Sequence, residues 1–69
     1  MILFDLSIYP ASAIHEAIQA FRDIAIIKAE FQENICNCDI LTNVYDTGLI
    51  EKEFGNYVLD LTVSKEREG

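Results

Sequence analysis

The stretch ILFDLSIYPASAIHEAIQAF, residues 2–21, changes its hydrophobic period at Pro10, and this change decides the fold. Before Pro10, apolar and other side chains alternate, which is the period of a half-buried β-strand. After it, apolar residues recur at spacings of three and four, which indicates a helix with one apolar stripe. Proline suits the first turn of a helix, where its missing N–H is not needed. We therefore expect a strand over residues 2–9 and a helix over residues 11–23. The expected helix stripe consists of Ile14, Ala17, Ile18 and Phe21.

The rest of the chain shows the same two periods in another order. Alternation in AIIKAEFQ (25–32) and DILTNVYD (39–46) predicts two strands that form a hairpin. The segment ENICNC (33–38) has no apolar period, and its asparagines favour a turn. A last helix is expected to begin after Asp46 or Thr47, either of which can cap it. Its polar end should fray from about residue 65.

This order of elements predicts one small domain over residues 1–69. A helix between the first two strands makes them parallel through a right-handed crossover. The third strand returns antiparallel to the second, and the simplest sheet places it between the other two. We therefore predict the α+β class: a two-layer β-α-β-β-α domain with a three-stranded mixed sheet and both helices on one face.

The charge of the chain argues against several classes of partner. Twelve acidic and five basic residues give a net charge of −7. Nucleic-acid affinity depends on Lys and Arg that neutralise phosphates, so neither nucleic acid nor an anionic membrane is expected as a partner. The apolar run Ile24–Ile27 is far shorter than the ~20 residues of a membrane span. The N-terminus carries no basic flank typical of a signal peptide. We expect a cytoplasmic protein with reduced cysteines.

The chain has more apolar residues than a thin two-layer domain hides. A chain of this length buries only ~60% of its surface on folding. The sheet face away from the helices would present Leu3, Tyr9, Ile26, Leu41 and Tyr45, and the last helix carries a second stripe. Mid-helix Gly55 could admit a neighbouring backbone. Single exposed apolar residues are the alternative interpretation, but we expect an interface. Its candidate residues are Leu3, Tyr9, Leu41, Tyr45, Gly55, Asn56, Leu59 and Val63.

Few residues suggest chemistry. Cys36 and Cys38, with Asp39 and His15, could contribute to a soft-metal site. A structural zinc needs four ligands, however, and the chain offers only two Cys and one His. We expect the cysteines to be reduced residues of a turn and His15 to be a helix-surface residue. There is no phosphate-binding glycine loop, HExxH motif or nucleophile elbow. We therefore expect no enzymatic activity, no cofactor and no metal.

The stretch EFGNYVLDLTVSKE (53–66) resembles the C-terminal signature of the HxsD family, small proteins of the His-Xaa-Ser system. The matching positions are Phe54, Asn56, Leu59 and Asp60. Leu61 stands where the family has an aromatic residue, and residues 63–65 stand where it has Leu-Arg-Glu. The opening DLSIYPASAIHEAIQAFRD (5–23) is also similar. The resemblance implies an accessory component of a radical-SAM maturation system, thought to modify a peptide with His-Xaa-Ser repeats. It supplies no catalytic residues.

Three hypotheses follow for the function. The first is a non-catalytic adaptor that binds a peptide or a maturation-enzyme partner and also self-associates as a homodimer. The second is a small metal or redox module that uses Cys36 and Cys38. The third is a purely structural homodimer.

Overall fold

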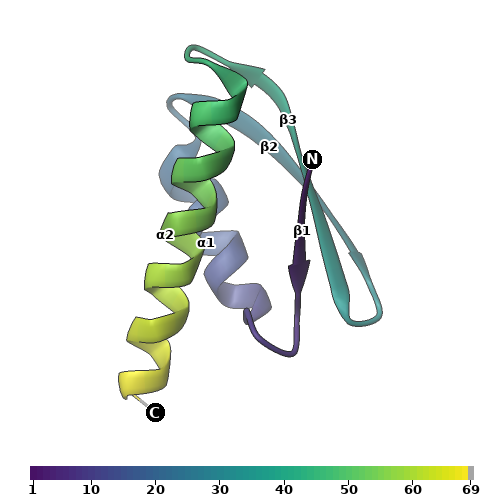
Figure 1. Cartoon of the computed structure of the whole chain (residues 1–69), viewed down its shortest axis with the longest axis vertical. Coiled ribbons are helices and arrows are strands. Elements are labelled where there is room, and N and C mark those ends of the chain that lie inside the picture. The colour runs from purple at the N-terminus through teal and green to yellow at the C-terminus, as the bar shows by residue number, and fades with distance from the viewer. Residues whose placement is uncertain (69) are drawn as a thin grey trace.

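The computed structural model describes residues 1–68 and has the predicted order of elements. These are β1 (Ile2–Asp5), α1 (Ala11–Phe21), β2 (Ala25–Gln32), β3 (Ile35–Asn43) and α2 (Thr47–Glu68). Both helices lie on the same side of the sheet (Figure 1). The α+β class is thereby confirmed.

The sheet has the strand order β1-β3-β2, and both hydrogen-bonded pairs are antiparallel. The prediction of a mixed sheet is wrong for a geometric reason. β1 and β2 run in the same direction, but β3 separates them, so they never form a parallel hydrogen-bonded pair. β1 is consequently an edge strand.

β1 is shorter than predicted because a turn ends it at Asp5. The Asp5 carboxylate accepts hydrogen bonds from the Ser7 N–H (2.9 Å) and hydroxyl (2.7 Å). These bonds hold the pKa of Asp5 below its usual value. The Asp5 carbonyl accepts from the N–H groups of Ile8 and Tyr9. The turn directs Tyr9 toward the helices, where its ring meets Phe4 edge-on at 5.3 Å between centroids. Tyr9 is therefore half-buried beside the core, and its predicted place on the far sheet face is wrong.

The β2–β3 hairpin is tighter than predicted. Its turn consists of Glu33 and Asn34, and Glu33 has a φ of 50°. A two-residue turn with positive φ matches the twist of two antiparallel strands. β3 therefore begins at Ile35, opposite Gln32, rather than at residue 39. Cys36 and Cys38 consequently lie within a strand, and the expectation that they belong to a turn is wrong.

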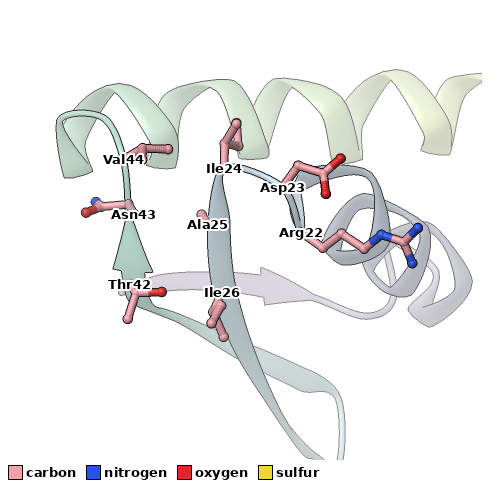
Figure 2. Close-up of a pocket in the computed structure, with 8 residues that line it drawn as sticks. All are labelled: Arg22, Asp23, Ile24, Ala25, Ile26, Thr42, Asn43 and Val44. Carbon is pink, nitrogen blue, oxygen red and sulfur yellow. The ribbon is translucent and has the colours of Figure 1, made fainter.

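A β-bulge interrupts the alternation of β3. Ile27 lies opposite Ile40, whereas Ile26 lies opposite Thr42, so Leu41 is an extra residue without a partner. After the bulge, Thr42 and Ile26 both point away from α2 (Figure 2). The faces predicted for residues 39–46 hold only as far as Ile40. β3 ends at Asn43, so Tyr45 lies in the following loop and not on the far sheet face.

The core forms between the helices and one face of the sheet. Phe54 of α2 contacts two other phenylalanines edge-on, Phe4 of β1 at 5.9 Å and Phe21 of α1 at 5.4 Å between centroids. Burial of each such side chain contributes roughly 1.5–3 kcal/mol. The expected stripe of α1 is confirmed at Ile14, Ala17 and Phe21, which are buried. The remaining core residues are Ala13, Ala25, Ile27, Cys36, Cys38, Ile50 and Val58.

α2 is capped at its start and long at its end. Asp46 is the cap: its carboxylate accepts from the Leu49 N–H at 3.2 Å. A Cβ on Gly48 would lie 3.1 Å from the same carboxylate, so glycine leaves room for the cap. α2 extends through Glu68, and Lys65 near its end pairs with Glu16 of α1 at 2.9 Å. The expected fraying from about residue 65 stays a prediction. Gly69, the last residue of that tail, lies outside the described residues.

Neither helix within residues 1–68 is long and apolar enough to cross a membrane.

Candidate interaction surfaces

The far face of the sheet is more polar than predicted. Its centre holds Asn37, which lies between Leu3 of β1 and Glu30 of β2. The next cross-strand pair is Asp39 with Lys28. Exposed apolar side chains, including Leu3, occupy the outer positions of this face. Tyr9 and Tyr45 do not lie on this face, so it carries fewer apolar side chains than the sequence predicts, and further exposed apolar surface lies elsewhere.

The first surface that is both apolar and unpartnered runs along the open edge of β1. The Leu6 N–H donates to the Asn34 carbonyl at 2.8 Å, at the end of the β1–β3 ladder. Hydrogen-bonded and non-hydrogen-bonded pairs alternate along an antiparallel ladder, so even-numbered residues of β1 bond to β3. The N–H groups of Leu3 and Asp5 and the Leu3 carbonyl therefore point to the open edge. The Asp5 carbonyl is already used by the turn.

α2 lies over this edge of the sheet. Phe54 packs on Phe4 of β1, and Glu51 forms an ion pair with the Met1 ammonium at 2.7 Å. That ion pair raises the pKa of the Met1 amino group, first through the hydrogen bond that the ammonium donates to Glu51. Glu51 therefore faces β1. Tyr57, about 120° away from Glu51 around the helix, and Lys65, about four turns further along than Glu51, contact α1.

Three residues of α2 extend this surface; we call Gly55, Leu59 and Val63 the outer row. Residues four apart in a helix rotate by about 40° beyond a full turn, so the row turns away from the core along α2. Leu59 is 45% exposed and Val63 is 38% exposed. Asn56 is exposed beside them.

Gly55 does not make room for any part of this chain. A Cβ built on Gly55 would meet no atom within 4 Å. The sequence-based expectation that Gly55 admits a neighbouring backbone is therefore not met within the described chain. The space beside it is open to another molecule.

The structure divides the eight predicted interface residues among several places. Leu3 lies on β1, whereas the outer row and Asn56 lie along α2. Tyr9 packs against the core. Leu41 is 58% exposed at the bulge, away from β1.

Tyr45 belongs to a second apolar surface, which the sequence analysis missed. It is a hollow of about 270 Å³ where the end of α1 meets the start of α2. Its lining residues, which we call the α1–α2 hollow, are Phe21, Ile24, Tyr45, Leu49, Ile50 and Glu53. The spacing of Leu49, Glu53 and Tyr57 along one side of α2 was the available sign of it. Tyr57 continues this side of α2, and its side chain is 40% exposed.

A third depression, shown in Figure 2, lies at the adjacent ends of β2 and β3 and is lined by residues 22–26 and 42–44. The Val44 N–H donates to the Ile24 carbonyl at 3.0 Å and so joins the two segments that line the depression. Its charged residues are Arg22 and Asp23, of which Arg22 donates weakly to Gln19 at 3.4 Å.

The two cysteines lie together in the core, under the helices. Their Sγ atoms are 3.7 Å apart, and both residues are 0% exposed. Burial raises the pKa of Cys36, and burial together with the nearby Cys36 raises the pKa of Cys38 to about 12. Both are therefore protonated near neutral pH, whereas the thiolate is the form that reacts and binds metals.

The remaining residues of the suggested metal site do not join the cysteines. Within residues 1–68, no group of three or more His, Cys, Asp or Glu side chains is placed to hold a metal ion. His15 is exposed on α1, and its ring lies against Phe31 of β2 at 5.1 Å between centroids.

Comparison with known proteins gives no match: no family model fits the chain, and no curated protein or solved structure is significantly similar to it.

Proposed function

We propose that this protein is a non-catalytic adaptor that binds an extended segment of a partner protein along the open edge of β1. The observation that carries the proposal is the position of α2. The start of the helix packs on the unpaired edge strand through Phe54 and Glu51, and Leu59 and Val63 are exposed further along it. A strand added to a sheet edge gains main-chain hydrogen bonds, and pockets for its side chains give specificity. Here the added strand extends the sheet, and α2 supplies the side-chain contacts.

The energy available at this edge is modest. Leu3 and Asp5 offer three main-chain groups, and each hydrogen bond contributes about 0.5–1.5 kcal/mol net. Covering an exposed leucine such as Leu59 adds at most about 1.5–3 kcal/mol. Loss of translational freedom opposes both contributions. A transient interaction, as expected for an adaptor, fits this balance.

The class of partner is proposed from the resemblance to HxsD. Among the positions that match its signature, Phe54 is buried, whereas Asn56, Leu59 and Asp60 are exposed. A signature on an exposed helix side supports a role in recognition, because no packing within the chain requires it. We therefore propose the peptide or a maturation enzyme of a radical-SAM system as the partner, in the cytoplasm.

Self-association through the same edge is the second candidate. An open edge strand is a template for its own copy, so two β1 strands could join two sheets into one. The charge of −7 on each chain opposes this dimer. The metal or redox module is the least favoured, because both sulfurs are fully buried and their thiols are hard to ionise.

The proposal is tested by pull-down with radical-SAM maturation proteins. Leu59→Glu should abolish capture, and the matched control Leu41→Glu, an exposed leucine at the bulge of β3, should retain it. Leu3→Pro is a second test, because proline is tolerated on an edge strand where its missing N–H faces solvent. It should leave the fold intact by circular dichroism and weaken capture. Unchanged capture by both Leu59→Glu and Leu3→Pro would reject the proposal, and sedimentation over a concentration range separates adaptor from homodimer.

A further inference from the structure

We infer that the α1–α2 hollow is a second docking site, which takes one large apolar side chain from a basic segment of a partner protein. Leu49 in the hollow lies about 80° around α2 from Leu59 of the outer row and about 15 Å nearer the start of the helix. The inference goes beyond the proposed function, because it does not depend on strand addition at β1.

The base of the hollow is rigid. Phe21 is 8% exposed and Ile50 is 2% exposed, so both belong to the core. Phe21 is held edge-on between Phe54 and Tyr57, at 5.4 Å and 5.6 Å between centroids. A side chain that enters the hollow therefore meets a surface that is already in place, and binding does not have to order it.

The rim of the hollow is apolar and exposed. Tyr45 is 59% exposed and Leu49 is 51% exposed. Tyrosines beside a small apolar depression are typical of the residues that dominate the energy of protein interfaces. The volume of about 270 Å³ is below the ~300–1,000 Å³ of sites that enclose a drug-sized ligand. One large side chain is therefore a better fit than a small molecule.

The charge around the hollow favours a partner with basic residues beside its apolar anchor. Glu53 lines the hollow; Asp23 and Asp46 adjoin its lining residues in the chain, as do Arg22 and Lys52, and the whole chain carries a net charge of −7. Within residues 1–68, the ion pairs join Met1 to Glu51, Lys28 to Glu30 and Lys65 to Glu16, so none neutralises these three carboxylates. A partner with Lys or Arg next to its apolar anchor complements this rim.

The same charge disfavours a second copy of the chain as the occupant. Each copy carries a net charge of −7, so two acidic rims would face each other. The negative charge that repels a second copy attracts a basic segment.

The test is a titration of the full-length ¹⁵N-labelled protein with a probe peptide, acetyl-Lys-Lys-Trp-Leu-Lys-Lys-amide, followed by amide chemical shifts. The largest shifts should fall on Ile24, Tyr45, Leu49 and Glu53. Two matched peptides, one with Ser-Ser in place of Trp-Leu and one with Glu in place of every Lys, should bind at least tenfold more weakly. Binding of the first peptide should weaken as salt is raised, because the rim charges are exposed.

Variants then locate the site. Leu49→Gln should raise the dissociation constant about tenfold, equivalent to ~1.4 kcal/mol, and Glu53→Gln by about threefold. Leu59→Gln, about 15 Å further along α2 from Leu49, should leave the dissociation constant unchanged. Shifts centred on β1, equal binding of the Glu peptide, or shifts that grow with protein concentration alone would overturn the inference. Loss of partner capture by Leu59→Glu would still stand in that case, so the two proposals fail separately.

Discussion

Two neighbouring rows of α2 differ completely in their surroundings although they are one residue apart. The inner row, Phe54, Val58 and Thr62, is buried at 4% exposure or less. The outer row, Gly55, Leu59 and Val63, follows each of these by one residue, a rotation of about 100°. The inner row even contains a threonine, whose hydroxyl donates to the Val58 carbonyl at 2.8 Å, while the outer row ends in valine. Burial of the apolar Val63 instead of the polar Thr62 would stabilise an isolated domain more, yet Thr62 is the buried one. The difference shows that hydrophobicity alone does not mark the core of this helix, and the outer row requires another explanation.

The largest contrast between the rows is expected in stability. Phe54→Ala removes a ring packed against both Phe4 and Phe21, so it should lower the free energy of unfolding by about 3–5 kcal/mol. Leu59→Ala should change it by less than about 0.5 kcal/mol, as surface substitutions usually do. Urea unfolding followed by circular dichroism measures both. Equal losses from the two variants would mean that the outer row belongs to the core.

The core beneath the inner row should also make stability depend on alkaline pH. The folded-state pKa of Cys38 is raised to about 12, above the 9.0 of an unperturbed thiol. The contribution of the protonated Cys38 thiol to the free energy of unfolding is therefore complete below pH 9. It is lost as pH rises toward 12, by up to ~1.4 kcal/mol per pH unit. Urea unfolding at pH 8, 9.5 and 10.5 checks this. Cys38→Ala should flatten the decline, and an identical decline in that variant would assign it to other groups.

Substitutions of Gly55 in the outer row should affect stability and binding in opposite directions. Gly55→Ala should raise the free energy of unfolding by roughly 0.5–1 kcal/mol, because alanine favours the helix and its Cβ meets open space. Gly55→Leu fills that space and should weaken capture of the partner while the fold is retained. Thermal unfolding and pull-down of the same samples provide the comparison. A loss of stability in Gly55→Ala would show that the glycine has a role within the chain.

The smallest effect is expected at the turn that ends β1, which sets the length of the open edge. The pKa of Asp5 is lowered by hydrogen bonds from Ser7, so its contribution is present above about pH 4 and is lost as pH falls through the folded-state pKa. Asp5→Asn should remove this small acid-dependent part, measured by thermal unfolding between pH 2 and pH 5. Ser7→Ala should remove it as well, and an unchanged profile in both variants would mean that the turn does not depend on the carboxylate.

The sequence predicted the elements well where one period dominated. The second strand, residues 25–32, and the first residues of both helices follow from uninterrupted alternation or from three-and-four spacing. The core stripe of α1 was predicted for the same reason.

The errors occurred where a local backbone event overrode the period. The Asp5 turn interrupts an alternation that continues to Ile8 in the sequence, and only hydrogen bonds to its carboxylate and carbonyl reveal it. The turn at Glu33 requires a positive φ at a glutamate, and positive φ is uncommon for residues other than glycine. The bulge at Leu41 leaves no mark in composition.

The candidate site was predicted only in part for a related reason. The outer row was found because residues of one helix share a periodicity. The α1–α2 hollow joins Ile24, Tyr45 and Leu49 from separate segments, and their proximity depends on how the helices pack.

The most direct test of the central claim is amide hydrogen exchange at Leu3 and Asp5, measured with and without a partner captured in the pull-down. Both N–H groups point to the open edge, so they should exchange rapidly in the free protein, unlike that of Phe4. If a partner strand adds to β1, exchange at Leu3 and Asp5 should slow at least tenfold in the complex. Rapid exchange at both positions in a saturated complex would contradict binding along this edge.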